Sequence, residues 1–185
     1  MMNRLVLLFI TCFIVSFSNA QINVSLDRDC LSINSAMLAQ SLIKVVGSNK
    51  VKELIENEVR FLSVWDVDSL GRICKFDKLL SQKGSLPEDA MNKLELYLIK
   101  RETRFFICYD KLPGINDNDA YKIITEDLFA RNEESLIINV SFPGELMILY
   151  EYEKEKAEKQ NHKLSRYVYF RKQIKKYLQV PRKVF

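Results

Sequence analysis

The feature that most constrains the fold is a block of β-branched and aromatic residues at positions 59–68. Apolar side chains recur there with a two-residue period, which is typical of a strand that buries one face. The residues of that face are Val59, Phe61, Trp65 and Val67. Asp68 to Gly71 follow as a turn, because Asp bonds nearby backbone N–H groups and Gly tolerates positive φ. Residues 72–78 then return as a second strand, so the block predicts a β-hairpin.

Helical patterns and two further strand patterns surround this hairpin. Ser85-Leu86-Pro87-Glu88 is typical of a capping box, and Ser165 of a helix cap. We expect strands over 103–110 and 134–142, and helices over 35–46, 48–57, 86–102, 117–131, 145–160 and 166–178. This order predicts an α+β fold, with a small, mostly antiparallel sheet, helices packed on one face and a C-terminal helical arm.

The first 20 residues have the three zones of an export signal. Arg4 supplies a positive start, residues 5–17 form an uncharged apolar run, and Ser18-Asn19-Ala20 places small residues where a signal peptidase cleaves. A membrane-spanning helix needs about 20 residues, more than this run provides. We therefore expect cleavage near Ala20 and a periplasmic or extracellular mature chain, with an uncleaved anchor as the alternative.

Charge is distributed unevenly along the rest of the chain. We expect an α+β domain over 21–142 and a helical arm over 143–185, whose end is strongly basic. Residues 161–185 contain eight Lys or Arg and no Asp or Glu, although the whole chain carries only +4. Such a segment docks to its own domain, to anionic lipid or to an acidic partner, or is simply a solvated helix face. The candidate interaction residues are Arg166, Arg171, Lys172, Lys175 and Lys176.

Three cysteines remain once residues 1–20 are removed, namely Cys30, Cys74 and Cys108. Outside the cytoplasm a disulfide persists, and an odd number leaves at least one thiol free or intermolecular. Cys74 and Cys108 fall in predicted strands that can face each other, so we predict that they form the disulfide. The alternative is that both are small core residues. No C-x-x-C occurs, which argues against a redox pair or a zinc knuckle.

No set of residues commits the chain to a reaction. His162 is the one histidine, and no nucleophile motif accompanies it. Asp66 and Asp68 share a strand face and are a candidate carboxylate pair, although a strand end and turn explain them better. Residues 116–119 lack the Gly and Glu partners of an EF-hand loop and are typical of a helix cap. We therefore predict no catalytic, metal-binding or cofactor-binding residue.

Residues 59–110 resemble the TonB C-terminal domain. The shared order is a strand, a turn with Asp68 and Gly71, a second strand, a helix entered at residues 86–90, and a third strand. The resemblance covers under a third of the chain, and the family's Pro-rich spacer, N-terminal anchor and Phe-x-Pro signature have no match. It implies a related fold used for protein contacts in a cell envelope and carries over no functional residue. The chain otherwise resembles a small exported bacterial protein.

These observations favour a non-enzymatic protein-interaction module of the cell envelope. Its partner is an unknown protein or an anionic envelope surface, bound through the basic arm or by adding a strand to an exposed sheet edge. Export argues against nucleic acid as the partner. Two alternatives stay open: an envelope enzyme with a carboxylate-based site, and a peripheral membrane protein that uses the basic C-terminal helix.

Overall fold

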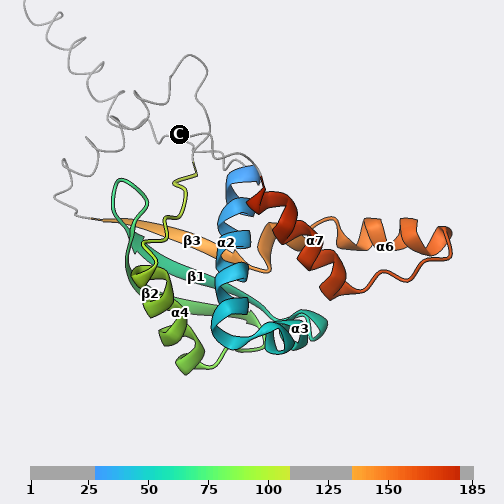
Figure 1. Cartoon of the computed structure of the whole chain (residues 1–185), viewed down its shortest axis with the longest axis horizontal. Helices are drawn as coiled ribbons and strands as arrows, with labels where there is room; N and C mark the ends of the chain where they lie inside the picture. Colours follow the sequence, from blue (N-terminus) through green and yellow to red (C-terminus); the bar gives the residue numbers. More distant parts are fainter. Residues whose placement is uncertain (1–27, 109–134, 180–185) are drawn as a thin grey trace, which may run out of the picture.

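The computed structural model describes residues 28–108 and 135–179 (Figure 1). Three strands form one antiparallel sheet in the order β2-β1-β3: β1 is Arg60–Val67, β2 is Ile73–Lys83 and β3 is Leu136–Phe142. The hairpin predicted from the central block is the β1–β2 pair, and the strand predicted over 134–142 is β3. The expected export signal, the helix over 117–131 and the capping residues before it lie outside the described residues.

The two-residue period of β1 decides which side chains enter the core. Phe61, Trp65 and Val67 are buried on the face that the helices cover, as the sequence predicts. The register sets Phe61 opposite Phe142 of β3, and the two rings stack with centroids 4.9 Å apart. Each large apolar side chain buried in this way stabilises the fold by about 1.5–3 kcal/mol.

Three helices of the N-terminal half pack around this sheet face. They are α2 (Arg28–Val46), α3 (Ser48–Glu56) and α4 (Glu88–Lys100). α2 runs across the sheet beside α4 (Figure 1) and buries small and aliphatic residues, including Leu38 and Leu42. Gly47 stands between α2 and α3 with φ of 86°, a conformation that glycine adopts without a steric penalty. The predicted α+β class, a small antiparallel sheet with helices, is confirmed.

The C-terminal part consists of a short 3₁₀ helix and two α-helices. η1 is Gly144–Met147, α6 is Tyr150–Lys159 and α7 is Arg166–Leu178. The single helix expected over 145–160 is therefore divided after η1. α7 packs against α2 and α3, whereas α6 extends away from the body (Figure 1). Phe170 and Ile174 of α7 belong to the same hydrophobic core as the sheet, so α7 is a core helix although it lies in the predicted arm.

The strand expected over 103–110 is not formed in its described part. Arg104 makes only an isolated bridge to Arg72, next to a bond from the Phe105 N–H to the Gly71 carbonyl at 2.9 Å. A side chain on Gly71 would collide with the Phe105 backbone, which explains glycine at this position. Phe105 packs edge-on against Trp65, with ring centroids 5.7 Å apart. At the residue after Phe105, the backbone N–H and carbonyl form hydrogen bonds with a side chain of α2.

The predicted capping box at the start of α4 is also wrong. The helix begins two residues later than the serine requires, with Pro87 as the N-cap residue and no side-chain cap. Ser85 is exposed and lies outside the helix. Glu88 and Asp89 occupy the first turn instead, where their charge is favourable near the positive end of the helix dipole.

Candidate interaction surface

Helix α7 carries the basic residues that the sequence indicates as an interaction site. The hydroxyl oxygen of Ser165 accepts a hydrogen bond from the Val168 N–H at 3.3 Å, so the cap predicted for this helix is confirmed. It satisfies one of the amide donors that every helix start leaves open. From this start, Phe170 and Ile174 fall one turn apart on the side that enters the core.

Four cations lie on the opposite side of α7. Their spacing of i, i+1, i+4 and i+5 places them on one stripe that points away from Phe170 and Ile174. All four side chains are exposed, and within residues 28–108 and 135–179 none of them takes part in an ion pair. We call this set the basic face; it consists of Arg171, Lys172, Lys175 and Lys176.

The basic face is chemically suited to an acidic ligand. α7 contains no acidic residue, so no charge on the helix itself neutralises the stripe. The guanidinium of Arg171 can bond a carboxylate or phosphate with two parallel N–H groups, while each lysine acts as a compact point charge. Lys175 and Lys176 lie in the last turn, where a cation also stabilises the helix dipole. The Lys176 ammonium lies over the Tyr177 ring, 4.8 Å from its centroid.

Arg166 does not belong to this surface, although the sequence grouped it there. Its guanidinium is 2.5 Å from a carboxylate oxygen of Glu58 and 3.0 Å from one of Glu151, and it lies 4.9 Å from the centroid of the Tyr150 ring. Glu58 also bonds Lys83 at the end of β2. The hydrogen bond from Lys83 and the charge of Arg166 hold the pKa of Glu58 below its usual value. Arg166 thus joins helices α6 and α7 to the sheet.

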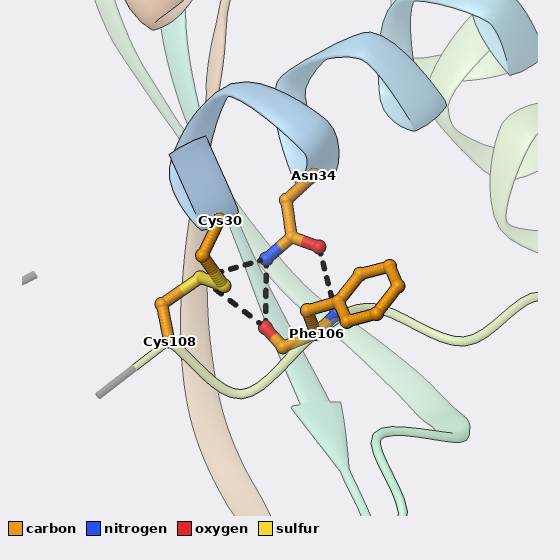
Figure 2. Close-up of a disulfide and its surroundings, with 4 residues drawn as sticks. All are labelled: Cys30, Asn34, Phe106 and Cys108. Carbon is orange, nitrogen blue, oxygen red and sulfur yellow. Dashed lines mark hydrogen bonds between the residues drawn. A yellow bond between two sulfur atoms is a disulfide. The ribbon is translucent and has the colours of Figure 1, made fainter. Parts of the chain in front are cut away.

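A disulfide ties the start of α2 to the segment that follows Phe105. It joins Cys30 and Cys108, whose Cα atoms are 5.6 Å apart (Figure 2). One turn along α2, the buried side-chain amide of Asn34 donates to the Phe106 carbonyl at 2.8 Å and accepts from the Phe106 N–H at 2.7 Å. Asn34 therefore bonds the backbone as a neighbouring strand would.

The predicted disulfide between Cys74 and Cys108 is wrong. Cys108 is bonded to Cys30, and Cys74 is a free, exposed thiol. Cys74 follows the buried Ile73 in β2, so the two-residue period points its side chain away from the core. Cys108 lies beside α2, on the side of the sheet that the helices cover. The spacing of Cys30 and Asn34, one helical turn apart, places both on one side of α2, but nothing local in the sequence indicates the partner segment.

The two aspartates considered for acid–base chemistry, Asp66 and Asp68, have different surroundings. The carboxylate of Asp68 accepts from the backbone N–H groups of Leu70 and Arg72, both at 2.9 Å, and from the Arg72 side chain. Burial acts to raise the pKa of Asp68, but the bonds from Arg72 and Leu70 outweigh it and lower that pKa. Asp66 lies on the sheet face without helices, opposite Lys75 and Ile137. The hydrogen bonds of Asp68 therefore stabilise the turn between β1 and β2.

Among the described residues, no group of three or more His, Cys, Asp or Glu side chains gathers to hold a metal ion. Within the same part of the chain, no helix combines the length and apolarity that crossing a bilayer requires. The chain matches no protein-family model, no curated protein and no solved structure. The resemblance of residues 59–110 to the TonB C-terminal domain accordingly stays a prediction.

Proposed function

We propose that this chain is an exported, non-enzymatic interaction module of the cell envelope that binds an acidic protein partner through the basic face of α7. The observation that carries the proposal is a row of four exposed cations, none of which forms an ion pair among the described residues. The same helix buries Phe170 and Ile174 in the core. The cations are therefore presented by a rigid element, so binding does not require the helix to fold first.

Two features support the envelope as the compartment. The first 20 residues have the pattern of a cleavable export signal. The Cys30–Cys108 disulfide belongs to the kind of bond that persists in secreted and periplasmic proteins and is rare in the cytosol. The TonB-like order of elements in residues 59–110 adds an analogy to domains that make protein contacts in the envelope.

Peripheral binding to an anionic bilayer is the second candidate function. Val168 and Leu178 are exposed apolar side chains of α7, at 60% and 42% of their full exposure. Helical spacing places Val168 within the basic face and Leu178 at its margin. An apolar group among cations suits a headgroup layer. The apolar side of α7 is used by the core, however, so insertion would be shallow, and we favour the acidic protein surface.

The test compares two variants of equal net charge. The first changes the basic face to glutamine: Arg171→Gln, Lys172→Gln, Lys175→Gln and Lys176→Gln. The control neutralises four exposed lysines on other elements: Lys44→Gln, Lys52→Gln, Lys75→Gln and Lys100→Gln. Fluorescence anisotropy with a labelled polyglutamate peptide measures the affinity of each protein at low salt.

We expect the basic-face variant to bind the peptide about thirtyfold more weakly than the wild type, because four exposed charge pairs together contribute about 2 kcal/mol. The control variant should stay close to the wild type. Equal losses in both variants would show that net charge alone drives binding and would contradict the proposal. Flotation with phosphatidylglycerol vesicles is the parallel assay, and binding to vesicles without binding to the peptide would select the membrane alternative.

A further inference from the structure

The outward side of α7 carries apolar side chains as well as the basic face. Val168 and Leu178, exposed at 60% and 42%, are the exposed large apolar residues of this helix. Val168 stands three positions before Arg171, and Leu178 stands three positions after Lys175. Residues three or four positions apart are neighbours on a helix surface. The cations of the basic face therefore lie between two apolar ends.

The charges of this side alone support only weak binding. Exposed ion pairs contribute little each, so the four cations account for about a thirtyfold gain in affinity. Apolar surface that is removed from water adds to affinity in proportion to its area. A partner that also covers Val168 and Leu178 should therefore bind more tightly than a partner that offers negative charge alone.

The arrangement of the cations indicates the shape of that partner. Arg171 and Lys175 form one row along α7, with a spacing of i, i+4. Lys172 and Lys176 form a second row with the same spacing. A strand directs alternate side chains to opposite faces, so it turns a single row toward α7. A helix presents two neighbouring rows with the i, i+4 spacing of α7 itself, and can pair with both rows of cations.

We propose, on the basis of the proposed function, that the acidic partner docks an amphipathic helix lengthwise along α7. Its carboxylates pair with the two rows of the basic face, and an apolar residue near each of its ends covers Val168 or Leu178. These two residues are ten positions apart, which corresponds to about 15 Å of helix. The partner surface is therefore a helix of about three turns, acidic in the middle and apolar at both ends.

Three synthetic peptides of equal charge test this proposal by fluorescence anisotropy with the purified protein. The first copies the spacing of the outward side of α7, with glutamate in place of each cation, leucine in place of Val168 and Leu178, and alanine or glutamine elsewhere. The second has glutamine in place of both leucines. The third has a central proline, which breaks the helix. The first peptide should bind the wild type about tenfold more tightly than either of the others.

A protein variant locates the source of that difference. Val168→Gln combined with Leu178→Gln should abolish the tenfold advantage of the first peptide and leave the affinity for the second unchanged. The matched control combines Leu96→Gln with Ile99→Gln, because these α4 residues are exposed to a similar extent, at 69% and 41%. The control should keep the advantage. Circular dichroism of both variants checks that the fold is retained.

The basic-face glutamine variant distinguishes failure of this inference from failure of the proposed function. If all three peptides bind equally and need the basic face, the proposed function stands and the amphipathic helix is overturned. A proline peptide that binds as tightly as the first would show an extended partner and overturn the helix as well. Peptide binding that does not depend on the basic face, or binding to vesicles alone, would overturn both proposals.

Discussion

At the scale of single residues, the strongest local constraint joins the start of α2 to the chain after Phe105. The Cys30–Cys108 bond and the paired hydrogen bonds of Asn34 to Phe106 act within one turn of helix (Figure 2). Asn34 is buried, so its two bonds to the backbone are made away from competing water. The disulfide is covalent and therefore holds this junction even when the hydrogen bonds open.

Removing the disulfide should strongly destabilise the protein. Cys30→Ser, or reduction of the wild type, should lower the free energy of unfolding by about 4 kcal/mol, because the bond closes a long loop in the unfolded chain. The residues are separated by 78 positions. Chemical denaturation with and without reductant measures the change. Cys74→Ser is the control and should leave stability unaltered, since Cys74 is exposed and unbonded. A large loss in that control instead would contradict the assignment.

At the scale of elements, the two serines proposed as caps behave differently. Ser165 caps α7 through the Val168 N–H, whereas Ser85 lies outside α4 and caps nothing. Ser165→Ala should therefore cost about 1 kcal/mol of stability, and Ser85→Ala should stay within about 0.5 kcal/mol of the wild type. Urea unfolding midpoints give both values. Equal losses for the two serines would mean that α4 is capped as its sequence suggests.

The ionic contacts of Glu58 connect the turn before β1 with β2 and α7, and their effect should depend on pH. The bond from Lys83 and the charge of Arg166 lower the pKa of Glu58 in the folded protein. Its stabilising contribution is therefore complete above the ordinary glutamate pKa and is lost as the pH falls through the lower, folded value. Thermal unfolding measured from neutral pH down to below about pH 4 should show this loss.

Substitution isolates the contribution of that one carboxylate. Glu58→Gln should be less stable than the wild type at neutral pH and should lose less stability on acidification. Glu53→Gln is the matched change in α3, at an exposed glutamate whose ion pair is with Lys50 of the same helix. That control should follow the wild-type pH profile. A Glu58→Gln profile parallel to the wild type would show that the contacts of Glu58 do not contribute to stability.

At the scale of the whole molecule, the C-terminal helix completes the core. Phe170 is fully buried, and its ring meets that of Phe142 at a centroid distance of 5.8 Å. Phe170→Ala should cost about 3–5 kcal/mol, because it leaves a cavity between α7 and the sheet. Val168→Ala, an exposed change in the same helix, should stay within about 0.5 kcal/mol of the wild type. A small loss at Phe170 would indicate that the helix is a separable arm.

This packing also explains why the basic face can act as a site. Because Phe170 and Ile174 hold one side of α7, the opposite side must point outward, and the four cations cannot fold back onto the core. Within α6, the one buried residue is Tyr150 in its first turn. Of the two C-terminal helices, α7 lies against the body whereas α6 extends away from it (Figure 1).

The local periodicity of the sequence alone determined much of this protein. The alternation in residues 59–68 indicated β1 and its buried face, and the pattern of residues 166–178 indicated a helix that carries basic residues. These features follow from neighbours along the chain, since a strand has a period of two and a helix of 3.6 residues. The cap at Ser165 is equally local and was predicted for the same reason.

Only the tertiary structure decided which distant residues meet. Cys30 rather than Cys74 bonds Cys108, Arg166 forms ion pairs with Glu58 and Glu151, and the backbone of Phe106 bonds the side chain of Asn34. Each of these contacts depends on how α2 and α7 pack on the sheet, and residues far apart in the chain have no shared periodicity that would reveal it. Local patterns determine which way a side chain points from its own element, whereas packing determines what that side chain reaches.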